Sequence, residues 1–126
     1  MQGWPDQRAR SNKGRTVSFD FAALVAQLTE DQRLAFYEIL AHDLTVVSRS
    51  VWSDDALADA AKVERMKWVN EILHRVTAKI RVMRLHSHVW TEEDFGSAIR
   101  HWVAQCPDID VDVQWALRHS HELAQR

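Results

Sequence analysis

Histidine is the residue of this 126-residue chain with the most evident capacity for chemistry, and the chain contains seven of them. Imidazole binds metals and exchanges protons near neutral pH. Glu71 and His74 have the Glu-x-x-His spacing of di-iron helix bundles, and Glu38 and His42 are four residues apart. At 100° per residue, however, both pairs fall outside the apolar stripes of their helices. Because both pairs lie outside the stripes that face the bundle interior, a metal-dependent helical-bundle enzyme is only an alternative hypothesis. No metal or other cofactor is predicted.

Two further histidine pairs, His86 with His88 and His119 with His121, are each separated by one serine. This spacing suits adjacent metal ligands on a strand better than on a helix. Both pairs fall near predicted helix ends, where a charged imidazole interacts favourably with the negative end of the helix dipole. We interpret them as helix-terminal side chains, and zinc binding at the surface is left open.

The single cysteine, Cys106, ends an apolar stripe directly before Pro107, which is typical of a small buried hydrophobic residue. His101 precedes it by five residues and does not face it on a helix. The sequence contains no nucleophile elbow, Walker loop, dinucleotide fingerprint or cysteine set for zinc. We therefore predict no catalytic residues and a protein that is not an enzyme. One cysteine and no apolar export segment also predict a cytoplasmic location.

Charge changes sign along the chain, although the formal net charge is only -2. Residues 20–59 hold eight acids and two bases, residues 60–91 hold seven bases and two acids, and residues 92–112 hold six acids and one base. A basic segment thus lies between two acidic ones. Pairing of opposite charges within the chain explains this pattern without any ligand.

An alternative explanation is a surface that contacts the phosphates of nucleic acid. Residues 1–15 lack apolar periodicity and carry four bases and one acid, which indicates a flexible basic arm. This alternative joins the arm to the basic segment. On a helix, however, the bases of that segment spread around the axis and form no single stripe. The residues concerned are Arg8, Arg10, Lys13 and Arg15 in the arm and Arg75, Lys79, Arg81 and Arg84 in the segment.

Six tryptophans are an excess for a chain of this length. Trp102 fits an apolar stripe and is expected in the core, whereas Trp68 lies off the seam of its own helix. Off-stripe aromatics are typical of interfaces, although packing under the C-terminal helices would also explain Trp68. The leading hypothesis is a small non-enzymatic interaction or regulatory protein that binds a protein partner or forms a homo-oligomer. The predicted contact residues are Trp68, Val82, Leu85, Arg75, Lys79, Arg81 and Arg84.

A long helix over residues 59–86 is the element that must organise the others. Its apolar residues alternate spacings of three and four, which indicates an a/d seam. At 1.5 Å per residue such a helix is about 42 Å long and needs a long partner. The apolar stripe over residues 29–51, which begins at a capping box of Thr29 and Gln32, supplies one. We expect these two helices to form an antiparallel hairpin. The seam residues are Met66, Val69, Leu73, Val76, Ile80 and Met83.

Shorter helices are predicted on both sides of the hairpin. Residues 19–28 carry an apolar stripe with Ser18 or Asp20 available as its cap, and a second helix begins after Thr91 and ends before Pro107. Residues 108–113 alternate acidic and apolar side chains. A short strand would have this pattern, but no second strand candidate exists to pair with it, so a capped turn is preferred. The last helix is expected from Val113 onward.

Composition agrees with a helical protein. Three glycines and two prolines leave little material for the tight turns of a β-sandwich, and a hydrophobic content of 46% is that of a globular domain. We predict an all-α fold, a small helical bundle of four to five helices built around a long antiparallel helical hairpin. The arm of residues 1–15 would precede a single domain of residues 16–126. No apolar run approaches the roughly 20 residues that a membrane span needs.

Overall fold

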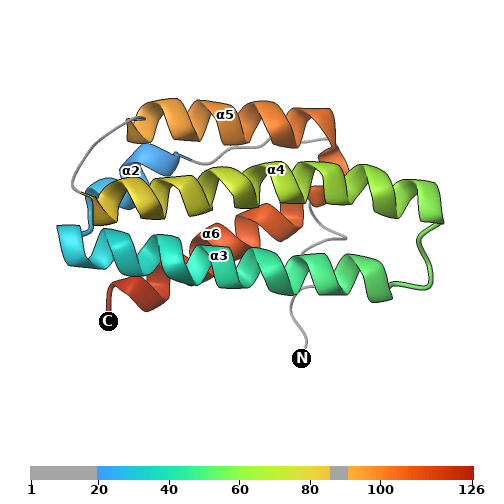
Figure 1. The fold of residues 1–126 in the computed structure, drawn as a ribbon, viewed down its shortest axis with the longest axis horizontal. Coiled ribbons are helices and arrows are strands. Elements are labelled where there is room, and N and C mark those ends of the chain that lie inside the picture. The colour runs from blue at the N-terminus through green and yellow to red at the C-terminus, as the bar shows by residue number, and fades with distance from the viewer. Residues whose placement is uncertain (1–19, 86–90) are drawn as a thin grey trace.

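The computed structural model describes residues 20–85 and 91–126, and within these ranges every regular element is helical (Figure 1). The predicted all-α bundle is therefore confirmed. Five α-helices and one 3-10 turn follow one another along the described chain. They are α2 (Phe21–Ala26), α3 (Glu30–Ser53), α4 (Asp59–Arg84), α5 (Glu92–Gln105), the 3-10 turn η1 (Pro107–Ile109) and α6 (Asp110–Ala124).

The two long helices, α3 and α4, lie side by side and run in opposite directions (Figure 1). Glu38 near the start of α3 pairs with Arg84 at the end of α4. At the other end of the hairpin, the ammonium group of Lys62 donates to the carbonyl oxygen of Trp52 at 3.1 Å. Helix α6 packs on α3 and helix α5 packs on α4, so each long helix carries one shorter helix.

Threonine caps begin two of the helices, as the sequence predicts. The Thr29 hydroxyl accepts from the backbone N–H of Gln32 at 3.2 Å, and the Gln32 side chain accepts from the Thr29 N–H at 2.9 Å. Thr91 accepts from the N–H of Asp94 at 3.0 Å. Each contact satisfies a backbone donor that has no partner inside the helix. Both helix starts are therefore fixed by local sequence.

The last helix begins earlier than predicted. Pro107 opens the 3-10 turn η1, and α6 starts at Asp110 rather than Val113. Asp110 and Asp112 lie in its first turn, where acidic side chains favour the positive end of the helix dipole. Val111 and Val113 are both buried because this first turn is covered on more than one side. Alternation of apolar and acidic residues here reflects that burial, and the residues form no strand.

An aromatic cluster joins α2 to α3 and α5. The ring of Phe21 lies 6.0 Å from Phe36, 6.2 Å from Tyr37 and 5.2 Å from Phe95, centroid to centroid. Gly96 permits this approach, since a Cβ atom there would lie only 3.0 Å from the Cβ of Phe21. The six-residue helix α2 is thus held by two fully buried side chains, Phe21 and Val25.

The buried face of α4 differs from its predicted seam. Ile72 is fully buried, whereas the seam residues Leu73, Ile80 and Met83 are only half-buried. The core-facing side is rotated because α5 and the turn η1 share the covering of α4 with α3. Two apolar residues of the α4 region outside the seam remain uncovered in the described chain: Val63 is 60% exposed and Leu85 is 70% exposed. Trp102, by contrast, lies in the core as predicted.

Bases of α4 pair with acids of the other helices. Arg84 pairs with Glu38 of α3, Lys79 Nζ lies 3.5 Å from Glu92 of α5, and Arg65 lies 2.5 Å from Asp112 of α6. The alternation of charge along the sequence thus corresponds to contacts between helices. This arrangement supports the interpretation of the charge pattern as pairing within the chain.

The phenol of Tyr37, the only tyrosine, donates to the carboxylate of Glu92. Burial and the negative charge of Glu92 raise the pKa of Tyr37 far above its usual value near 10. The neutral phenol therefore stabilises the fold below about pH 10, and this contribution is lost as the pH rises further. We expect absorbance at about 295 nm to show no tyrosinate until the protein unfolds in alkali, whereas a chain unfolded in guanidinium titrates near pH 10. Titration of Tyr37 near pH 10 in the folded protein would contradict its contact with Glu92.

No helix in the described ranges has both the length and the apolar content needed to cross a membrane.

Candidate functional site

A shallow groove of about 630 Å³ runs between α3 and α6 and is open to solvent. Ala35, Ile39 and Val46 of α3 and Trp115 and Leu123 of α6 form its apolar lining. Four ionisable side chains complete it: Glu38, His42, Asp43 and His119. The residues on α3 span positions 35 to 46, about 17 Å along the helix axis.

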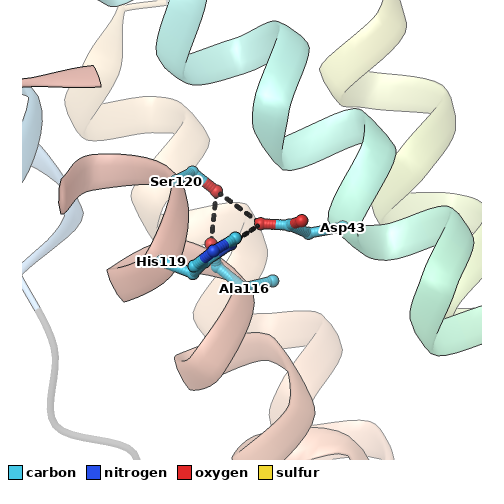
Figure 2. Close-up of polar contacts among 4 residues, drawn as sticks. All are labelled: Asp43, Ala116, His119 and Ser120. Atoms are coloured by element: carbon cyan, nitrogen blue, oxygen red, sulfur yellow. Dashed lines mark hydrogen bonds and ion pairs between the residues drawn. The ribbon is translucent and has the colours of Figure 1, made fainter. Parts of the chain in front are cut away.

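A buried carboxylate is among the lining residues of this groove, and Figure 2 shows its polar contacts. The side chain of Asp43 is only 3% exposed, and its Oδ2 atom lies 2.8 Å from Nδ1 of His119. The hydroxyl of Ser120 reaches the same oxygen at 3.4 Å and also donates to the carbonyl oxygen of Ala116. An ionised carboxylate can only accept hydrogen bonds, so Nδ1 of His119 carries a proton. The contact thus fixes Nδ1 as the ring nitrogen that donates to Asp43.

The orientation of His119 is fixed by a second contact. Its ring stacks on the indole of Trp115, one helical turn earlier, with centroids 4.9 Å apart and an interplanar angle of 12°. The side chain is nevertheless 39% exposed. The other ring nitrogen, Nε2, has no hydrogen-bond partner within the described residues. His119 therefore presents one ring edge that the rest of the described chain does not use.

The contact between Asp43 and His119 is not among the sequence-based predictions. The sequence predicts His119 at a helix end near the dipole, whereas the structure places it against Asp43, 76 residues earlier. One signal was available: Asp43 lies three residues after Leu40 and four before Val47, on the buried stripe of its helix. A charged side chain on such a stripe requires a polar partner. The identity of that partner depends on how α6 packs on α3.

The two Glu–His pairs singled out by their spacing lie on separate helices, α3 and α4. His42 and Glu38 lie on the exposed side of α3, His74 is exposed on α4, and Glu71 pairs with Arg75 at 3.3 Å. Within residues 20–85 and 91–126, no group of three or more histidine, cysteine, aspartate or glutamate side chains could hold a metal ion. His86 and His88 lie outside the described residues, and His121 is buried.

The apolar residues predicted to contact a partner, Trp68, Val82 and Leu85, differ in exposure. Trp68 is half-buried against the core, and its indole N–H donates to Glu64 at 3.0 Å. Val82 is half-buried, and Leu85 is exposed at the end of α4. At 100° per residue, these three side chains lie within about 100° of the helix circumference. Trp68 is thus partly covered by the core of its own chain.

The predicted basic contacts are largely used within the protein. Lys79 is only 6% exposed and lies against Glu92, so it is not available on the surface. Arg75 pairs with Glu71 and Arg84 pairs with Glu38. Of the four, only Arg81 has no ion pair within the described residues. Arg8, Arg10, Lys13 and Arg15 lie outside the described residues, as does the whole arm.

Two nucleophilic side chains of the described chain, Ser120 and Cys106, are buried. Ser120 is fully buried and its hydroxyl donates to Ala116, so it does not face Nε2 of His119. Cys106 is a buried free thiol, as predicted, and burial together with the charge of Asp108 raises its pKa. A neutral thiol is a poor nucleophile. The groove thus presents one oriented imidazole beside an apolar lining.

Comparisons with known proteins return no relative: no family model, curated protein or solved structure matches the chain.

Proposed function

We propose that the protein is a non-enzymatic interaction protein, and that the groove between α3 and α6 binds an amphipathic helical segment of a partner protein. The observation that carries this proposal is the combination of an apolar lining with a rim of polar side chains on two packed helices. Binding of an amphipathic helix in such a groove is a recurrent mode of protein recognition.

The shape of the groove favours a protein segment over a small molecule. Small-molecule sites are concave and bury most of their ligand, whereas this groove is open to solvent. Its length of about 17 Å along α3 matches three turns of a helix. A partner segment with apolar residues at i, i+4 and i+7 would place them against Ile39, Val46 and Leu123.

The experiment selects displayed peptides of about 16 residues against the full chain. We expect the selected peptides to carry apolar residues at helical spacing and to lose at least tenfold in affinity for an Ile39→Asp variant. Ile39 is half-buried in the groove, so a carboxylate there would be desolvated when a peptide binds. Calorimetric titration measures the affinity of each variant.

Val63→Asp is the matched control. Val63 is an exposed apolar residue on α4, outside the groove, and the same substitution there should leave peptide affinity unchanged. Peptides that bind Ile39→Asp as well as the original protein would contradict the proposal. Loss of binding in both variants would contradict it as well, because the groove would not then be the surface responsible.

A further inference from the structure

The groove contains more ionisable groups than an apolar docking surface requires. Two of its acids are already paired within the chain: Asp43 with His119, and Glu38 with Arg84. The groove therefore has no acid without a basic partner among the described residues. His42 and the Nε2 edge of His119 are left as the polar groups that can meet a ligand.

We propose that His119, together with His42, binds a carboxylate group of the partner segment. This inference rests on the proposed docking function of the groove and adds the chemistry of one contact. When His119 is an imidazolium, its Nδ1–H is directed to Asp43 and its Nε2–H is a donor at the groove surface. A carboxylate is the acceptor that gives such a donor its strongest hydrogen bond.

The buried carboxylate of Asp43 lies against His119. A carboxylate that is 3% exposed is costly unless a positive group lies beside it, and His119 is the ionisable base that contacts Asp43. The pair is neutral as a whole, so the groove does not repel a second carboxylate through Asp43. Stacking on Trp115 holds the ring, so little conformational freedom is lost when Nε2 binds. Asp43 is thus a positioning residue for His119.

The test uses the full chain labelled with nitrogen-15, at about pH 6, and two small probes, hexanoate and hexanamide. Both probes offer the same apolar chain to the groove, and only hexanoate carries a carboxylate. We expect hexanoate to shift the imidazole nitrogen resonances of His119 and His42 and to bind at least tenfold more tightly than hexanamide. Equal binding of the two probes, or no shift at either imidazole, would overturn the carboxylate contact.

Three variants locate the effect. Asp43→Asn should reduce the affinity for hexanoate at least tenfold, leave hexanamide binding unchanged and alter the nitrogen resonances of the His119 ring. His119→Gln should abolish the preference for hexanoate, whereas His74→Gln, which changes an exposed histidine on α4, should preserve it. If His119→Gln does not fold, the comparison of the two probes on the original protein still decides the question.

This test is independent of the test of the docking function. Peptides that require Ile39 while hexanoate shows no preference over hexanamide would retain the groove as a docking site and remove the carboxylate contact. A preference for hexanoate in a protein whose peptides ignore Ile39 would leave a carboxylate site without the proposed helix partner.

Discussion

Replacing Asp112 by asparagine is expected to lower the free energy of unfolding by about 3–5 kcal/mol. Arg65 and Asp112 form an ion pair whose side chains are only 5% and 3% exposed. The Nε atom of Arg65 is also buried without a hydrogen-bond partner among the described residues. Removal of the carboxylate charge would therefore leave a buried guanidinium without compensation. Urea unfolding followed by circular dichroism measures the change.

Glu71→Gln is the control for this prediction. It removes an acid from the ion pair with Arg75, whose side chains are about two-fifths exposed. Exposed pairs of this kind contribute about 0–1 kcal/mol, so the two variants should differ clearly. Joint replacement of Arg65 by methionine and Asp112 by leucine should recover most of the lost stability, since both charges are then absent. An equal, small loss in Asp112→Asn and Glu71→Gln would contradict the account of the buried pair.

Replacing Phe21 by alanine is expected to cost about 3–5 kcal/mol, a loss typical of a large aromatic side chain removed from a core. Phe21 is fully buried and contacts Phe36, Tyr37 and Phe95. Because α2 has only six residues, it has little stability of its own. We therefore expect the amides of α2 to lose their protection against hydrogen exchange.

Leu24→Ala is the matched control on the same helix. Leu24 is only half-buried, so its truncation should cost clearly less than that of Phe21. The loss of stability in Phe21→Leu, which retains an apolar side chain in the pocket, should lie between the losses in Phe21→Ala and Leu24→Ala. If α2 keeps its protected amides in Phe21→Ala, then another contact holds this helix and the aromatic cluster has a smaller role.

Much of the fold is predictable from local sequence. The capping box at Thr29 and the cap at Thr91 fix two helix starts. The apolar stripes of residues 29–51 and 59–86 indicate the hairpin. The start of α6 was predicted three residues late, because burial on several sides of its first turn resembles the period of a strand. Local periodicity cannot distinguish a strand from a helical turn that several other helices cover.

The groove could not be predicted in the same way. Asp43 and His119 are far apart in the sequence and meet only because α6 packs on α3. A charged residue within the stripe of α3 indicates a buried polar contact, but it does not identify the partner. Likewise, the surface or core position of Lys79 depends on where Glu92 lies, and α5 sets that position. Such contacts follow from tertiary packing rather than from spacing along one helix.

The most direct test of the docking function is a nuclear magnetic resonance footprint of a selected peptide on the full chain. We predict that backbone and methyl shifts concentrate on the groove residues of α3 and α6, around Ile39, Val46 and Leu123. Shifts concentrated instead on the exposed side of α4, around Arg81 and Leu85, would contradict the proposal. The partner surface would then be the one that the sequence alone suggests, and the groove would have no part in docking.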